Sequence, residues 1–161
     1  TGVQTCALPI CKSGMICCYE AVKRVGPTGN VIGLVRNEEE KARLKRLGLK
    51  MQIVVGDARN AIDVMNTTLA HNNGCEVDVA INMVNIPNTE MSSILPVKDD
   101  GIVYFFSMST SFTKAALGAE GVGKDVTMIV GNGYTKGHAE ITLEELRENE
   151  TLRKIFEELY V

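Results

Sequence analysis

The sequence predicts an α/β fold, a doubly wound sheet of parallel strands with helices on both faces. Short continuous runs of β-branched and other apolar residues, typical of strands buried on both faces, recur along the chain. Stretches with a helical hydrophobic period separate these runs, and glycines mark many of the boundaries. Because alternating strands and helices join through right-handed crossovers, a parallel sheet covered on two faces follows.

The elements follow one another in a regular order. A helix is expected at residues 15–25, where apolar side chains recur at helical spacing until Gly26-Pro27-Thr28-Gly29 ends it. A buried strand follows at 31–35. The later strands are expected at 53–55, 77–81, 102–106 and 126–130. The later helices are expected at 38–47, 61–69 with Asp57 as its N-cap, 90–97, 113–117, 138–147 and 151–159.

Residues 1–11 do not fit this pattern. Pro9 donates no hydrogen bond to a ladder, and Gln4 and Thr5 are polar, so a buried parallel strand is disfavoured. Residues 1–10 also resemble a translated sequencing adapter, so 1–11 is expected to be a non-native leader; a genuine amino-terminal segment is the alternative. With a first strand restored, the order would be 3-2-1-4-5-6. The Rossmann-type sheet is therefore expected to be truncated at its first, central strand.

Composition limits the class of protein. A chain of 161 residues with 45% hydrophobic residues is long enough for one domain with its own core. The net charge of -3 gives no basic surface for nucleic acid, and no apolar run approaches the ~20 residues that span a bilayer. The five cysteines lack CxxC spacing, so no metal site is expected. These features favour a cytoplasmic protein without nucleic-acid or membrane partners.

Gly14 opens the first helix and has the place of the third glycine in a dinucleotide-binding loop, the one that lets helix and strand pack closely. In open α/β sheets, ligands bind beyond the carboxyl ends of the strands, where the strand order switches. Applied to this chain, that rule selects the residues that follow each strand. The expected cofactor-binding residues are Ser13, Gly14, Arg36, Asn37, Asp57, Ala58, Asn82, Met83, Val84, Ser107, Met108, Gly131 and Asn132.

Each of these segments also has a purely structural interpretation. Arg36 could accommodate a 2′-phosphate, which favours NADP or dual use, or could be a solvated charge at a strand end. Asp57 could line an adenine pocket or cap a helix. Asn82 could meet a nicotinamide ribose or carboxamide, since buried amides need partners, or could belong to a turn. The hydroxyl-rich segment 107–111 could bond a cofactor or substrate edge, and the glycines of 131–134 permit either close approach to a ligand or a simple turn.

No side chain stands out as the catalytic group. His138 begins a helix and is expected to be a capping or packing residue, and His71 has no assigned role. The acidic runs Glu38-Glu39-Glu40 and Glu144-Glu145 are expected to be solvated helix faces. The chemistry would therefore come from a hydride cofactor that the protein positions, and the catalytic residues remain unassigned.

Several strings together resemble one family. The four strings are Lys12-Ser13-Gly14-Met15, residues 25–33, Val103-Tyr104-Phe105-Phe106-Ser107-Met108, and residues 131–140. These are similar to the L-erythro-3,5-diaminohexanoate dehydrogenases of bacterial lysine fermentation, a family with the layout of medium-chain dehydrogenases. The resemblance implies that residues 12–161 form an NAD(P)-binding Rossmann domain, and that a separate amino-terminal catalytic domain is absent from this sequence.

The resemblance also implies an activity. It would be the NAD(P)-dependent oxidative deamination of L-erythro-3,5-diaminohexanoate to 5-amino-3-oxohexanoate, with NAD favoured by the family and NADP as the alternative. The expected partner is then a small-molecule amino-acid substrate, and assembly into a homo-oligomer is left open. The alternatives are a generic medium-chain alcohol or quinone oxidoreductase and a nucleotide-binding module without catalysis. A fragment that lacks the first half of its cofactor loop is expected to be inactive alone.

Overall fold

The protein was analysed as a computed structural model, which describes residues 2–6, 12–131 and 135–161. Its strands form one six-stranded sheet in the order β3-β2-β1-β4-β5-β6, and all neighbours pair in parallel. The α/β class and the doubly wound strand order are therefore confirmed. Because β1 and β4 are neighbours, the switch in strand order lies between them, and their carboxyl ends open on a crevice.

The elements alternate along the chain as predicted. The strands are β1 (Gly2–Cys6), β2 (Asn30–Val35), β3 (Gln52–Val55), β4 (Val77–Asn82), β5 (Val97–Phe105) and β6 (Val126–Val130). The helices are α1 (Lys12–Val25), α2 (Glu38–Lys45), α3 (Ala61–His71), α4 (Glu90–Ile94), α5 (Phe112–Val122), α6 (His138–Glu148) and α7 (Glu150–Tyr160).

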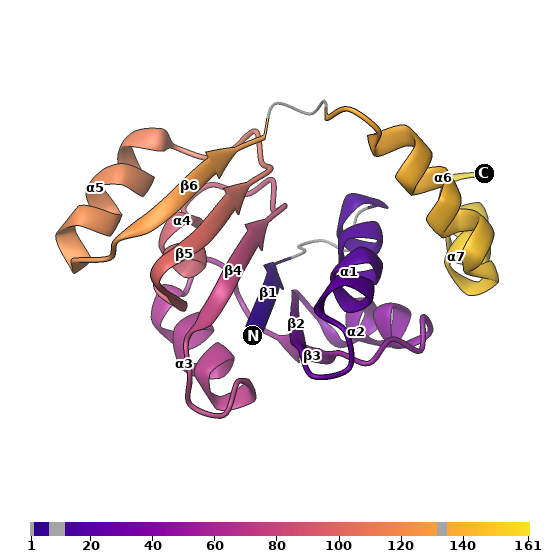
Figure 1. The fold of residues 1–161 in the computed structure, drawn as a ribbon, viewed down its shortest axis with the longest axis horizontal. Helices are drawn as coiled ribbons and strands as arrows, with labels where there is room; N and C mark the ends of the chain where they lie inside the picture. The colour runs from indigo at the N-terminus through magenta and orange to yellow at the C-terminus, as the bar shows by residue number, and fades with distance from the viewer. Residues whose placement is uncertain (1, 7–11, 132–134) are drawn as a thin grey trace.

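Helices cover both faces of the sheet (Figure 1), and α3 packs on the face of β2 and β3 opposite α1 and α2. Helices α1 and α2 pack on the β1–β3 half, and α7 joins their core through the buried Leu152 and Ile155. Helices α4 and α5 pack on the β4–β6 half around the buried Phe105. Helix α6 reaches back from the far edge of the sheet to α1, so the last two helices close on the first one.

The prediction about the first strand is wrong. Gly2–Cys6 forms strand β1 in the centre of the sheet, where it pairs with β2 on one side and β4 on the other. The ladder is made by backbone N–H and C=O groups, which every one of these residues provides. Hydrogen bonds to both β2 and β4 therefore stabilise the strand despite the low strand propensity of its side chains. Pro9, which argued against a strand, lies outside the described residues. The sheet is thus not truncated at its central position.

Several local boundaries also differ from prediction. Helix α4 ends at Ile94, and β5 begins at Val97, because a bulge shifts the β4–β5 register after the pair Val77 and Val97. Gly101 lies within the shifted segment, where a Cβ would lie 2.4 Å from Val97 Cγ1. Helix α5 continues to Val122 rather than ending near 117. The N-cap of α3 is Asn60, whose side chain accepts from the Asp63 amide, so Asp57 is not the cap.

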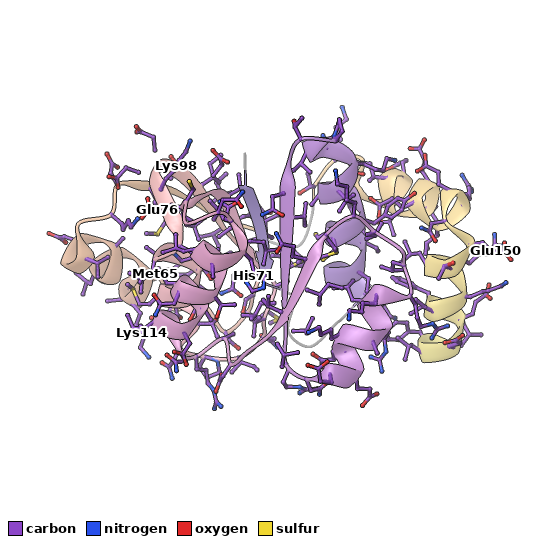
Figure 2. The ribbon with its side chains drawn as sticks, turned by 90° about the horizontal axis from the view of Figure 1, so that it is seen from below. Met65, His71, Glu76, Lys98, Lys114 and Glu150 are labelled. Carbon is purple, nitrogen blue, oxygen red and sulfur yellow. The ribbon has the colours of Figure 1, made fainter. Side chains whose placement is uncertain are left out.

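Charges of both signs are interspersed over the surface. Figure 2 shows Glu76, Lys98, Lys114 and Glu150 at the periphery of the molecule. His71 ends α3, and its backbone oxygen accepts from the Asn30 and Gln52 side chains, which ties this helix to the start of β2 and β3. Among the described helices, none is long and apolar enough to cross a bilayer.

Candidate functional site

The carboxyl ends of the strands open into three cavities. The β2–β3 cavity, of about 340 Å³, is lined by Arg36, Gly56, Asp57, Arg59 and Ile86. The β5–β6 cavity, of about 500 Å³, is lined by Phe106, Ser107, Met108, Thr110, Phe112, Val130 and Gly131. The α1–α6 cavity, of about 410 Å³, lies between those helices and the ends of β4 and β5. All three therefore lie along the edge where a doubly wound sheet binds its ligands.

Two arginines dominate the β2–β3 cavity. The Arg36 guanidinium lies 2.8 Å from Glu40 Oε1, and Glu40 Oε2 also accepts from the Arg36 backbone amide at 2.9 Å. Arg59 donates to both carboxylate oxygens of Asp57, and these hydrogen bonds lower the pKa of Asp57 to about 2. The structure thus brings the predicted Arg36 and Asp57 together and adds Arg59, which the sequence analysis did not select.

The neighbours of these residues have structural roles. Asn37 is the N-cap of α2, and its Oδ1 accepts from the Glu40 amide at 2.9 Å. Ala58 is 2% exposed and belongs to the apolar core beneath β2 and β3. Glu40 is 3% exposed, so the prediction that this acidic run is a solvated face is wrong at Glu40. Its burial follows from the donors that Arg36 supplies.

Asn82 ends β4 inside the protein, and its amide is satisfied by the chain itself. Its nitrogen donates to Thr89 Oγ1 at 3.0 Å and to Ser93 Oγ at 2.9 Å. Its oxygen accepts from the Val84 amide at 3.0 Å. The need for an external partner, which motivated the prediction of a ligand at Asn82, is therefore removed. Val84 is fully buried and belongs to the same core as Ala58.

The β5–β6 cavity contains the hydroxyl-rich segment after β5. Ser107 Oγ donates to the Val84 backbone oxygen at 2.6 Å, so this hydroxyl links the ends of β4 and β5. Met108 is almost fully exposed. Gly131 allows Tyr104 to pack against the chain, because a Cβ there would lie 2.5 Å from the Tyr104 hydroxyl. Asn132, predicted beside Gly131, lies outside the described residues.

Two helix faces with the same spacing form the α1–α6 cavity. Helix α1 contributes Ser13, Ile16, Cys17 and Glu20; helix α6 contributes His138, Ile141, Thr142 and Glu145. Both sets follow the i, i+3, i+4, i+7 spacing of one helix face. Ile81 and Met83 from β4, with Tyr104 and Phe106 from β5, form the apolar wall opposite. Of the predicted residues, Ser13 and Met83 therefore meet here, and Gly14 lies buried beside them in the first turn of α1.

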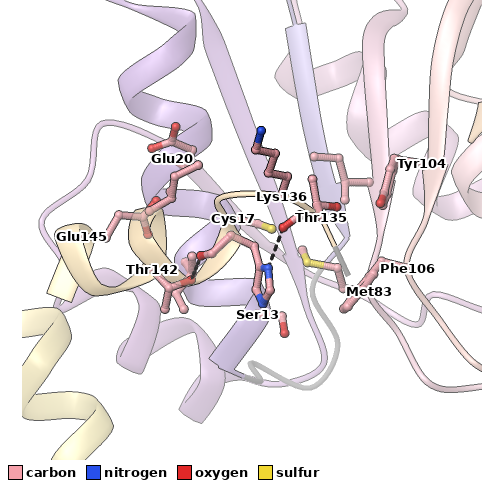
Figure 3. Close-up of a pocket in the computed structure, with 14 residues that line it drawn as sticks. Ser13, Cys17, Glu20, Met83, Tyr104, Phe106, Thr135, Lys136, Thr142 and Glu145 are labelled. Carbon is pink, nitrogen blue, oxygen red and sulfur yellow. Dashed lines mark hydrogen bonds between the residues drawn. The ribbon is translucent and has the colours of Figure 1, made fainter. Parts of the chain in front are cut away.

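The two glutamates lie together at one end of the α1–α6 cavity, away from Met83 and Phe106 (Figure 3). Glu145 is only 1% exposed, and neither of its carboxyl oxygens has a hydrogen-bond partner among the described residues. Burial raises the pKa of Glu145 to about 8, and the neighbouring Glu20 adds to the rise. The prediction that Glu144-Glu145 is a solvated face is therefore wrong at Glu145, while Glu144 is exposed as predicted.

Two of the positive charges near this pair have carboxylate partners, and the exposed Lys136 also lines the cavity. Arg24 binds Glu20 at 2.6 Å, and Lys23 binds Glu148 at 2.8 Å. The Lys23 bond lowers the pKa of Glu148. His138 begins α6, two turns before Glu145, and its Nδ1 is 2.6 Å from the Thr135 backbone oxygen. Glu145 is thus the buried carboxylate that these cations leave without a direct partner.

The sequence contained a signal for this cavity. The spacing that joins Ser13 to Glu20 and His138 to Glu145 is visible in the letters, and it predicts that each glutamate shares a face with the residue two turns earlier. Nothing local predicts that the two faces meet, because α1 and α6 are far apart in the sequence. No group of three or more potential metal ligands occurs among the residues that the structure describes.

Known proteins give the site a context. The chain is 68% identical over 150 residues to L-erythro-3,5-diaminohexanoate dehydrogenase of Fusobacterium nucleatum, and 65% identical over 150 residues to the enzyme of that name from Acetoanaerobium sticklandii. The resemblance predicted from the sequence is confirmed. Each match covers 93% of this chain but only 44% of the relative, so the chain spans less than half of their length. No family model matches the chain.

Solved structures share the fold. An alcohol dehydrogenase from Thermotoga maritima matches with a TM-score of 0.70 at 11% identity, covering 95% of this chain and 41% of that one. A Haloferax mediterranei glucose dehydrogenase, in complex with NADP, zinc and gluconolactone, matches with a TM-score of 0.60 at 12% identity. The match covers 97% of this chain and 43% of that one. The nucleotide-binding subdomain of the enoylreductase domain of PpsC from Mycobacterium tuberculosis matches with a TM-score of 0.57 at 19% identity. This match covers 97% of this chain and 81% of that one. These structures share the Rossmann-type α/β fold of the chain, with its doubly wound parallel sheet.

Proposed function

We propose that this chain is the nucleotide-binding part of an NAD(P)-dependent dehydrogenase that oxidatively deaminates L-erythro-3,5-diaminohexanoate to 5-amino-3-oxohexanoate, a step of lysine fermentation. The observation that carries the proposal is the 65–68% identity, over 93% of the chain, to two enzymes of that name. Identity at this level covers most of the chain, whereas the fold alone is shared with dehydrogenases of several substrates.

The cavities fit a dinucleotide. The β2–β3 cavity lies where the adenosine ribose is bound in this fold, and Arg36 and Arg59 offer guanidinium groups suited to a phosphate. Ser13 and Gly14 lie in the first turn of α1, where backbone N–H groups and the helix dipole favour an anion. Ser107 and Met83 would flank the nicotinamide half. Family analogy favours NAD, and the two arginines support use of NADP as well.

The bound cofactor would supply the hydride acceptor for the oxidation of the 3-amino carbon. That carbon loses a hydride and its nitrogen a proton, and water then converts the imine to the ketone with release of ammonium. A neutral amine gives up hydride more readily than an ammonium ion. The apolar wall formed by Met83, Tyr104 and Phe106 excludes water and so favours the neutral form at the reacting amine.

The test is an assay of the whole protein that contains this chain. Incubation with L-erythro-3,5-diaminohexanoate and either NAD or NADP is expected to form the reduced cofactor, ammonium and the 3-oxo acid in equal amounts. A generic alcohol or quinone oxidoreductase would instead turn over alcohols or enones. Intact binding of the dinucleotide, without turnover of the diamino acid, would contradict the proposed function.

A further inference from the structure

The α1–α6 cavity contains an unusual combination of burial and charge. Glutamates 40, 90 and 145 are the acidic residues buried in the described part of the chain. Glu40 accepts from Arg36, and Glu90 accepts from the Ser111 amide at 2.8 Å. Glu145 has no such donor on either oxygen. Because an unpaired buried carboxyl group is costly, Glu145 either shares a proton with the neighbouring Glu20 or binds a positive group that enters the cavity.

The neighbouring carboxylate of Glu20 makes a cation a suitable ligand for Glu145, in place of a shared proton. Glu20 lies beside it at the same end of the cavity (Figure 3), and two adjacent carboxylates repel each other unless a positive charge or a proton comes between them. Near Glu145 lie Tyr19 and Lys23 on α1 and Glu148 on α6. Lys136, which is exposed, and His138 also line the cavity. Lys23 is bonded to Glu148, and Arg24 binds Glu20 from outside the cavity.

The shape of the cavity distinguishes an organic cation from a metal ion. Calcium and magnesium require several oxygen ligands, and the described residues contain no group of three or more His, Cys, Asp or Glu side chains that could hold a metal ion. The space of about 410 Å³ is instead walled by the side chains of Ile16, Ile81 and Ile141, which suit an aliphatic chain. A primary ammonium group can donate three hydrogen bonds, so it could satisfy both oxygens of Glu145 and one of Glu20.

We propose that Glu20 and Glu145 form a binding site for an aliphatic primary ammonium group. Resting on the proposed function, the site would hold the 5-ammonium group of the diamino acid, which the reaction leaves intact. The two ends of the cavity would then treat the two nitrogens of one substrate differently. The glutamate end keeps one nitrogen charged, and the end formed by Met83 and Phe106 favours the neutral form of the other.

Binding at this site releases a proton. A protonated Glu145, which can donate to Glu20, gives up its proton when the alkylammonium ion takes its place, so the carboxylate and the ammonium form an ion pair. The affinity for the cation is therefore expected to rise between pH 6 and pH 8, a window that ends at the pKa of about 8. Tyr19 and Lys23 stay protonated in this window, since the pKa of each is raised.

The experiment is a calorimetric titration of this 161-residue chain with n-butylammonium chloride, with n-butanol as the neutral probe. Saturable binding of butylammonium, at least about tenfold tighter than butanol, is expected. Glu145→Gln should weaken butylammonium binding at least about tenfold and abolish proton release, and Glu20→Gln should weaken it by about threefold. The matched control is Glu144→Gln, which removes the same charge from an exposed position of the same helix and should change nothing.

The outcomes separate this site from the proposed function. Equal affinity for butylammonium and butanol, or unchanged binding by Glu145→Gln, would overturn the ammonium site whatever the enzyme oxidises. Circular dichroism of each variant checks that weaker binding does not reflect loss of the fold. If butylammonium binds as expected but the whole protein does not oxidise the diamino acid, the site stands and the proposed function fails.

Discussion

Glu40 and Glu145 are both buried in helices, yet their surroundings are opposite. Glu40, in the first turn of α2, accepts from the backbone and side chain of Arg36 and lies at the N-terminal end of the helix dipole. Glu145, in the second half of α6, has no donor and faces the carboxylate of Glu20. The first is built into the fold, and the second lines a cavity. A buried acid is thus evidence for a binding site only when its own chain leaves it unsatisfied.

Removal of the Glu40 carboxylate is expected to have the largest effect on stability. Glu40→Gln leaves the Arg36 guanidinium unpaired and turns an amide nitrogen toward its donors, so the free energy of unfolding should fall by about 1–3 kcal/mol. Urea denaturation of the variant and of Glu39→Gln measures this. Glu39 forms an exposed pair with Arg43, so its loss should cost less than about 0.5 kcal/mol. If both variants lost the same free energy of unfolding, the buried Glu40 would contribute no more to stability than the exposed Glu39.

The same substitution at Glu145 is expected to act in the other direction. Its pKa is raised from 4.5 to about 8 in the folded protein, so the folded state holds the proton more tightly than the unfolded chain. The stabilisation that Glu145 contributes through its proton is then fully present below pH 4.5 and is lost as the pH rises to 8. Glu145→Gln removes this dependence and should be more stable than the wild type at pH 8, by about 1–2 kcal/mol. Melting temperatures measured across this pH range would speak against the idea if the wild type showed no decline.

Arg36, the partner of Glu40, is expected to affect binding of the cofactor. Because Glu40 holds this guanidinium at the β2–β3 cavity, Arg36→Gln should weaken NADPH binding about tenfold, or about 1.4 kcal/mol, and NADH binding by less than about twofold. Fluorescence titration of the reduced cofactors measures both affinities. Equal weakening of the two would show that Arg36 does not meet the 2′-phosphate.

The smallest effect is expected at Asp57. This carboxylate is exposed and pairs with Arg59, so Asp57→Asn should change the free energy of unfolding by less than about 0.5 kcal/mol at neutral pH. Since its pKa is lowered to about 2, the pair is lost only in strong acid. The variant releases Arg59 and should bind NADPH up to about threefold more tightly. Weaker binding would assign Asp57 a direct part in holding the ribose.

The sequence alone predicted most elements because each carries a local pattern. The apolar run of β2 and the helical period of α1 depend on neighbouring residues only. The predictions that were wrong depend on contacts between elements that are far apart in the sequence. Glu145 is buried because α6 folds back on α1, and β1 exists because two strands flank it. Of the predicted site residues, Arg36, Asp57, Ser13 and Met83 line cavities, whereas Asn82 is satisfied within the protein. The sequence alone does not distinguish a polar side chain that hydrogen-bonds within the protein, such as Asn82, from one that binds a ligand.

The central place of β1 has a consequence for the cooperativity of unfolding. Strands β2 and β4 pair with β1 and not with each other, so its five residues carry the whole hydrogen-bonded seam between the two halves of the sheet. Domains unfold in cooperative units that follow such seams. A weakened β1 ladder would let the β2–β3 and β4–β6 halves melt at separate temperatures. Under the proposed function, the same opening would separate the part of the site for the adenosine ribose from the part for the nicotinamide, so loss of β1 would also weaken binding of the dinucleotide.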